Sequence, residues 1–116
     1  VITPYLPVGD NTVSKFFTDS GYDVVAIQGL GAYSPAQISH ISQEKIFQTI
    51  KEVDSADVEA IVQVGTNVAM ARAATIAEAW LNKPVISNNV VLYWHALRQS
   101  GIVDNFSGFG SLLESH

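Results

Sequence analysis

The chain has 116 residues, of which 47% are hydrophobic and 15% charged, and this composition fits one globular domain with a buried core. The net charge is −5 and the six basic residues are scattered, which argues against nucleic acid as a partner. The sequence holds no cysteine, so it contains no disulfide, thiolate metal site or cysteine nucleophile. No apolar run approaches the ~18 residues of a membrane span, and we expect a cytoplasmic protein without membrane contact.

Strand and helix patterns alternate along the chain, which is typical of a parallel sheet covered by helices. Short apolar runs bounded by turn residues predict the strands, over 1–3, 22–28, 60–64 and 85–87. Apolar residues at three- and four-residue spacing predict the helices, over 11–20, 35–40, 43–53, 67–81 and 90–100. The predicted caps at helix starts are Asp10, Ser34, Ser42, Thr66 or Asn67, and Asn88-Asn89. The tail is predicted to end in a helical turn near Leu112.

We therefore predict a single α/β lobe over residues 1–116, with a four-stranded parallel sheet in the order 2-1-3-4 and helices on both faces, as in flavodoxin-like folds. Ligands bind such sheets beyond the carboxyl ends of the strands. The loops at that edge begin at Pro4, Gly29, Gly65 and Asn88, and their side chains are polar but nearly uncharged. Because the first residues already fit a strand, we expect the chain to belong to a longer polypeptide.

The segment from Ala60 to Asn67 carries the main functional signal. It predicts a buried strand that leads through Gly65 into a helix, with main-chain N–H groups available to an anion at the turn. Glycine allows a ligand to approach the backbone closely, and Thr66 and Asn67 add side-chain hydrogen bonds. An ordinary turn that binds only water is the alternative.

Other candidate residues carry less chemistry. The phenol of Tyr5, directly after the first strand, is able to donate to a substrate oxygen, or its ring packs on the loop. The three histidines, His40, His95 and His116, lack the spacing of metal ligands, and we expect no metal site. The Gly29-Leu30-Gly31 sequence lacks the third glycine and the acidic residue of a dinucleotide fingerprint, so we expect no dinucleotide site there.

Three segments together resemble the C-terminal lobe of the Asp/Glu racemase superfamily, in its maleate cis-trans isomerase and arylmalonate decarboxylase branches. They are Thr3-Pro4-Tyr5, residues 64–67 and residues 93–98. The resemblance implies a two-lobed enzyme without cofactor, whose active site lies between the lobes and uses one cysteine from each. It also implies substrate-binding roles: Tyr5 as a carboxylate or oxyanion donor, Gly65, Thr66 and Asn67 as an amide cradle, and Pro35 and Ile38 along the apolar side of the substrate.

Val64 occupies the position of the family's C-lobe cysteine, and valine transfers no proton. Three functions follow as alternatives: a lobe of an isomerase or decarboxylase for a small dicarboxylate, a carboxylate-binding module without turnover, or a flavodoxin-like regulatory domain. In the first case the lobe alone is inactive and its acid or base comes from a missing N-terminal lobe. The expected partners are a small carboxylate and that lobe, with a homo-oligomer left open. Phe106, Phe109 and the helix around Trp94 are the candidate contact surface.

Overall fold

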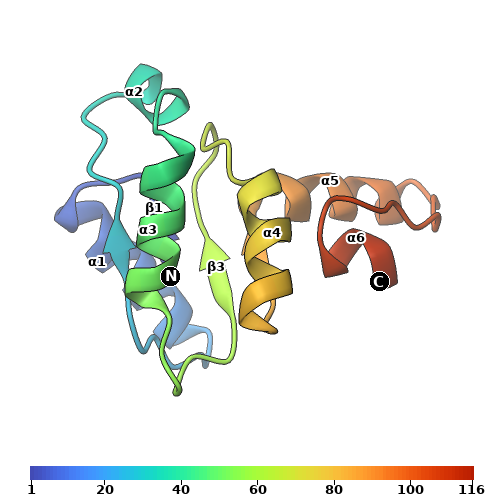
Figure 1. Ribbon diagram of the computed structural model, residues 1–116, viewed down its shortest axis with the longest axis horizontal. Coiled ribbons are helices and arrows are strands. Elements are labelled where there is room, and N and C mark those ends of the chain that lie inside the picture. Colours follow the sequence, from blue (N-terminus) through green and yellow to red (C-terminus); the bar gives the residue numbers. More distant parts are fainter.

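The computed structural model describes residues 1–116, and its centre is a parallel sheet (Figure 1). Its four strands lie in the order β2-β1-β3-β4, as predicted. The strands are β1 (Ile2–Thr3), β2 (Gln28–Gly29), β3 (Ile61–Gln63) and β4 (Val85–Ser87). In register, Ile2 lies opposite Gln28 on one side and Gln63 on the other, so β1 is a central strand. The predicted α/β fold class is confirmed.

Six helices connect and cover the strands. They are α1 (Pro7–Asp19), α2 (Pro35–Ser39), α3 (Gln43–Val53), α4 (Ala71–Leu81), α5 (Asn88–Gln99) and α6 (Ser111–Ser115). In Figure 1, α3 and α4 lie in front of the sheet and α1 lies behind it. Ser34 and Ser42 cap α2 and α3 as predicted, since their side chains accept hydrogen bonds from the N–H groups of Gln37 and Lys45.

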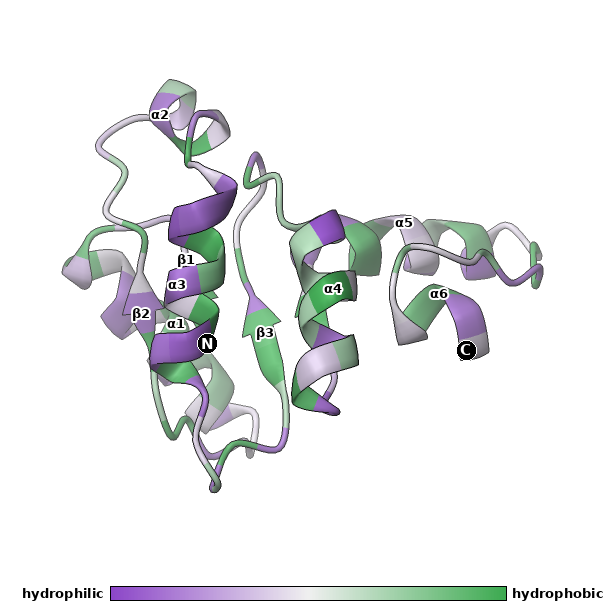
Figure 2. Cartoon of the chain, viewed as in Figure 1, coloured by the Kyte–Doolittle hydropathy of each residue, from purple (hydrophilic) through white to green (hydrophobic).

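The core lies between the sheet and the pair α3 and α4. Ile46 and Ile50 of α3 pack there with Ile2 and Ile61 of the strands and Met70 before α4. Burying such a side chain contributes about 1.5–3 kcal/mol, so this layer is the main source of stability. On the opposite face, α1 contributes no buried residue. In Figure 2, α3 shows alternating hydrophilic and hydrophobic bands, and most of β3 beside it is hydrophobic.

The start of α1 differs from the prediction. The helix begins at Pro7, and Asp10 lies inside its first turn instead of capping it. Proline is well suited to a first helical position, where its missing N–H group would have no partner in any case. Likewise, α5 begins at Asn88 with Ser87 as its N-cap, so the predicted start at 90 after an Asn88-Asn89 cap was wrong. Both helices start earlier than the apolar periodicity indicated.

The second strand is shorter than predicted. Only Gln28 and Gly29 pair with β1, although the apolar run suggested a strand over 22–28. Opposite this run, β1 begins only at Ile2, and the amino group of the preceding Val1 donates to the carbonyl of Ala26 at 2.6 Å. Residues 22–25 therefore run beside a position where no strand lies.

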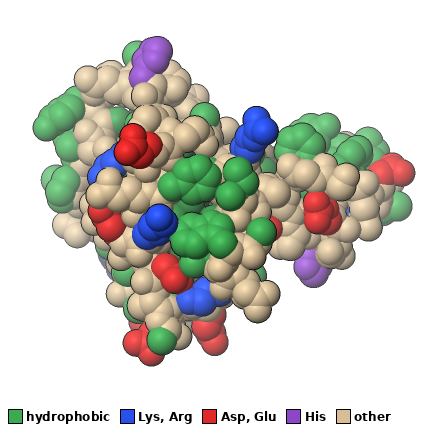
Figure 3. All heavy atoms as spheres, viewed as in Figure 1, with side chains coloured by type: hydrophobic (Ala, Val, Ile, Leu, Met, Phe, Trp, Pro, Cys, Tyr) green, Lys and Arg blue, Asp and Glu red, His purple; other side chains and the backbone are tan.

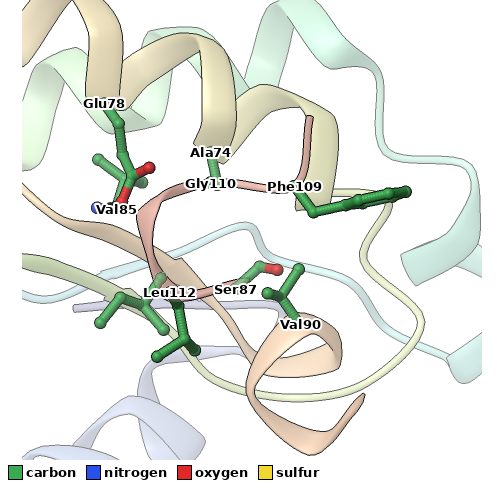
Figure 4. A pocket seen from close by; sticks show the side chains of 9 residues that line it. Ala74, Glu78, Val85, Ser87, Val90, Phe109, Gly110 and Leu112 are labelled. Atoms are coloured by element: carbon green, nitrogen blue, oxygen red, sulfur yellow. Dashed lines mark hydrogen bonds between the residues drawn. The ribbon is translucent and has the colours of Figure 1, made fainter. Parts of the chain in front are cut away.

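The C-terminal tail is held to α4 by one carboxylate. Glu78 accepts hydrogen bonds from the N–H and hydroxyl groups of Ser111, both at 2.8 Å, and from the N–H of Val85 at 3.1 Å. Figure 4 shows Glu78 and Val85 beside Gly110, with Leu112, Ser87 and Val90 on the other side of a small cavity. The predicted helical turn near Leu112 is present as α6.

The surface is mixed in character. Figure 3 shows hydrophobic side chains gathered on the face that carries α3 and α4, with basic side chains beside them. Ile76 and Trp80 of α4 are exposed, and the ammonium of Lys51 lies 5.6 Å from the Trp80 ring centre. None of the helices is both long and apolar enough to cross a membrane.

Candidate functional site

The loop from Val64 to Met70 joins β3 to α4 at the carboxyl edge of the sheet. We predicted that α4 would start at 67, but it starts at Ala71, with Met70 as an N-cap that makes no side-chain hydrogen bond. Gly65 and Asn67 have φ values of +94° and +69°, which turn the chain out of the strand and prevent an earlier helix start. Neither Thr66 nor Asn67 is the N-cap. The segment is therefore an irregular loop and not a tight turn.

Gly65 lies against the loop that follows β1. A Cβ atom placed on Gly65 would lie 2.8 Å from the Pro4 ring and 3.1 Å from the hydroxyl of Tyr5. The positive φ value and this close approach both require glycine. Two of the predicted site residues, Tyr5 and Gly65, are thus brought together at one edge of the sheet.

The buried side chain of Gln63 holds the first half of the loop. It is 2% exposed, and its Nε2 donates to the carbonyls of Val64 at 2.8 Å and Gly65 at 2.6 Å. Its Oε1 accepts from the N–H of Asn88 at 3.2 Å. One side chain therefore links the loop after β3 to the start of α5 and fixes their relative position.

The second half of the loop is held from α3 and from within. Gln43 donates from Nε2 to the carbonyl of Ala69 at 2.8 Å. The N–H of Met70 donates to the carbonyl of Val68 at 2.8 Å, and the side chain of Val68 is buried. Four carbonyls of the loop, those of Val64, Gly65, Val68 and Ala69, are therefore hydrogen-bonded.

Most main-chain N–H groups of the same loop have no hydrogen-bond partner. From Gly65 to Ala69, no main-chain N–H donates to an acceptor in the protein. Because most of the carbonyls are occupied and the N–H groups from Gly65 to Ala69 are available, the loop presents more hydrogen-bond donors than acceptors. Successive unpaired N–H groups in a turn that includes left-handed residues form a concave site for anions. This arrangement favours a carboxylate or phosphate over a cation.

A second small network supports Tyr5. The hydroxyl of Thr3 donates to the carboxylate of Asp10 and accepts from the N–H of Tyr5 at 3.1 Å. A Cβ atom on Gly29 would lie 2.6 Å from Asp10 Oδ2, so β2 also approaches this carboxylate closely. Asp10 thus anchors the loop after β1. No hydrogen bond to the hydroxyl of Tyr5 is formed within the protein, so it is available to a ligand.

The remaining predicted residues are less tightly placed. Thr66 and Asn67 are exposed on the loop, and Pro35 is exposed at the start of α2. Ile38 is half-buried and packs against the core. In the view of Figure 1, α2 stands at the same end of the molecule as the loop after β3. The roles of all six residues in substrate binding stay predictions. No cluster of three or more acidic or histidine side chains is suited to a metal ion.

This fold was compared with known protein families, sequences and structures. No protein-family model and no curated protein sequence matches the chain. Among solved structures, a maleate cis-trans isomerase from Nocardia farcinica, a mutant with a covalently bound succinylcysteine intermediate, superposes with a TM-score of 0.93 at 20% identity. The maleate isomerase of Pseudomonas putida S16 with maleate gives 0.89 at 26% identity, and a liganded mutant of arylmalonate decarboxylase gives 0.91 at 17% identity.

The chain has the fold of the Asp/Glu racemase superfamily. The resemblance stated from the sequence is confirmed at this level. The matches cover 97–99% of this chain but 47%, 45% and 51% of the three neighbours, so the chain spans about half of their length.

Sequence reasoning assigned no role to the two glutamines that hold the loop. Gln63 stood in the predicted buried strand 60–64, where a long polar side chain among valines and isoleucines must find hydrogen-bond partners. That requirement was a usable signal for a structural link at the strand end. Gln43 carried no comparable signal, because a glutamine at the start of a helix is common and usually solvated.

Proposed function

We propose that this chain is the C-terminal lobe of a cofactor-independent isomerase or decarboxylase that acts on a small dicarboxylate of the maleate or arylmalonate type. The observation that carries the proposal is the run of unpaired N–H groups from Gly65 to Ala69, beside the hydroxyl of Tyr5. The solved structures of similar fold, two maleate isomerases and an arylmalonate decarboxylase among them, support the substrate class.

The chemistry follows from the rigidity of the donors. In this proposal one substrate carboxylate binds the N–H groups of Gly65, Thr66 and Asn67, with the phenol of Tyr5 as a further donor. Donors that are already oriented stabilise negative charge as it develops on the oxygen atoms, without reorganisation during the reaction. The side chains of Gln63 and Gln43 keep these N–H groups oriented, because they bind carbonyls of the same loop. Pro35 and Ile38 line the apolar side of the substrate.

Proton transfer needs a group that this lobe does not supply at the end of β3. Val64 stands there, and the chain holds no cysteine. A covalent cysteine intermediate, as in the Nocardia farcinica isomerase mutant, therefore requires a thiol from the rest of a longer polypeptide. On this proposal the chain binds the substrate and the other lobe provides the acid or base.

The same observation favours a second candidate function. Because the site has donors for a carboxylate but valine at the predicted cysteine position, a binding module without turnover would use the identical loop. Turnover by a longer polypeptide distinguishes the two functions. A longer polypeptide that includes the other lobe either converts maleate to fumarate or decarboxylates a malonate, or it binds these acids unchanged.

The test on the chain itself is an amide chemical-shift titration with maleate. The expected result is saturable shifts at residues 65–69 and at Tyr5, with fumarate and phosphate as controls for geometry and charge. Maleate shifts that occur only elsewhere, or shifts of equal size with each anion, would argue against a dicarboxylate site. Turnover by the longer polypeptide would then be measured with Tyr5→Phe as the matched variant.

A further inference from the structure

A groove opens at the amino ends of the strands, opposite to the anion loop. It encloses about 530 Å³ and is largely apolar, and the residues that line it include Phe17, Val25, Ala26, Val58, Ala60 and Val62. Three carboxylates, those of Asp23, Asp57 and Glu59, also line it. The N-terminus, marked N in Figure 1, lies within the outline of the molecule and not at its margin. Val1 itself forms part of the groove wall.

The hydrogen bonds at Val1 continue the parallel ladder of the sheet. The nitrogen of Val1 donates to the carbonyl of Ala26 at 2.6 Å, and the N–H of Gln28 donates to the carbonyl of Val1 at 3.0 Å. A residue that donates to one partner and accepts from the partner two positions later is in regular parallel pairing. The ladder therefore reaches the mouth of the groove in register.

The register predicts what lies beyond Val1. Since Ile2 lies opposite Gln28 and Gln63, a residue joined before Val1 would lie opposite Ala26 and Ile61. The next would lie opposite Val25 and Ala60. Three of these four flanking residues line the groove, so its walls are the segments that lead into β2 and β3.

Most main-chain N–H groups along both walls are unpaired. From Asp23 to Ile27, no N–H donates to an acceptor in the protein, and the same holds for Glu59 and Ala60. Gln28 and Leu30 both donate towards β1, so Ala26 and Val24, at the same two-residue spacing, direct their N–H groups into the groove. Val25 and Ile27 direct theirs to the outer side of the edge strand. On the other wall, the N–H of Val64 donates to the carbonyl of Ile2. The N–H of Val62, two residues earlier in the strand, therefore points to the same side, into the groove.

We propose that this groove holds an extended segment of about four residues joined directly to Val1, which lengthens β1 as the central strand between residues 23–27 and 58–61. The segment binds by strand addition, with main-chain hydrogen bonds to both walls. Its last two residues are apolar, because one shares the core face with Ile2 and the other shares the groove face with Val1, and central parallel strands are apolar on both faces. The proposal does not depend on the anion site.

The amino group of Val1 supports a peptide bond at this position. Burial lowers the pKa of this group below its usual value of 8.0, because the ammonium form loses its water. A peptide N–H would donate to Ala26 in the same way without the cost of burying a charge. The carboxylates in the groove disfavour an acidic segment and suit a basic residue at its far end.

The experiment compares three versions of the chain: unextended, extended before Val1 by Lys-Ile-Val-Val, and extended by Lys-Ile-Pro-Val. The proline removes the N–H that would donate to the carbonyl of Val24 and disfavours the strand. The expected result is that the first extension raises the midpoint of thermal unfolding by about 5 °C or more, and that the proline extension does not. Amide hydrogen exchange should slow at Ala26 and Val62 and stay unchanged at Val25 and Ile27, a pattern that a general gain in stability would not produce.

The proposal is overturned if both extensions shift the midpoint equally or if exchange slows evenly along 23–27. Sedimentation velocity then shows whether the extended chain is a monomer or a dimer. If the extended chain is protected only as a dimer, the groove pairs with a second copy, and the proposal of a contiguous strand is wrong. If the extended chain is a monomer with alternating protection, the contiguous strand is confirmed.

Discussion

The two ends of the sheet both present main-chain N–H groups without partners, yet they are built for different ligands. At the carboxyl end, residues 65–69 offer N–H groups, while Gln63 and Gln43 bond the carbonyls of Gly65 and Ala69 in the same loop. At the amino end, most N–H and carbonyl groups are unpaired together, along two largely apolar walls on either side of the β1 axis. Donors alone suit an anion, whereas alternating donors and acceptors suit another strand.

The difference shows that an unpaired backbone group is not a site by itself. What decides its use is the state of the neighbouring acceptors and the side chains around it. The carboxyl end has the phenol of Tyr5 near Gly65, and the amino end has Val25, Val58 and Val62. The first end therefore has the features of a polar ligand site and the second those of a packing surface.

The largest effect on the carboxyl end is expected from Gly65→Ala. The new Cβ would meet Pro4 at 2.8 Å, and the residue would keep a φ of +94°. We expect a loss of about 2–5 kcal/mol in the free energy of unfolding, from left-handed strain and overpacking together. Urea denaturation measures it, with Gly21→Ala as the control, because Gly21 has a similar φ of +88° but open space around it. Equal losses in the two variants would contradict the close approach of the loops.

Gln63→Leu tests the link between the loop and α5. The substitution leaves the carbonyls of Val64 and Gly65 and the N–H of Asn88 without their partner. The expected loss is about 2–4 kcal/mol in the free energy of unfolding, because buried groups without a hydrogen bond are costly. Gln48→Leu is the matched control, since that exposed side chain bonds only Glu52. If maleate affinity of Gln63→Leu equals that of the unchanged chain, the side chain has no positioning role.

Much of this architecture could be predicted from the sequence. The parts that were missed depend on backbone conformations and distant contacts that local patterns do not reveal. The sheet order, the caps at Ser34 and Ser42, and the buried stripe of Ala73, Ala74 and Ala77 follow from local patterns. The start of α4 did not, because Gly65 and Asn67 both adopt left-handed backbone conformations and the helix begins only at Ala71. The site residues Tyr5 and Gly65 were found from motif and turn chemistry, whereas the contribution of Gln43 depends on a contact 26 residues away.

Tyr5→Phe separates binding from stability at the same end. The ring stays and the hydroxyl near Gly65 is lost, so the free energy of unfolding should change by no more than about 0.5 kcal/mol. Maleate binding should weaken by about 10- to 100-fold, the size of one hydrogen bond to a charged group. Isothermal titration calorimetry measures the affinity, and Tyr33→Phe, at an exposed tyrosine, is the control. An unchanged affinity in Tyr5→Phe would remove the phenol from the proposed site.

The smallest expected effect concerns the charge at the amino end. Burial lowers the pKa of the Val1 amino group in the folded chain below 8.0, so the folded state holds fewer protons than the unfolded state between those two pKa values. Stability should therefore rise with pH through this window and level off above pH 8. Acetylation of Val1 removes the charge, keeps an N–H for the carbonyl of Ala26, and places a carbonyl where a preceding residue would have one. We expect the acetylated chain to unfold at a higher temperature below pH 8, with the difference shrinking as pH rises. A difference that is independent of pH would mean that the acetyl group acts by packing or hydrogen bonding in the groove and that the buried charge contributes nothing measurable.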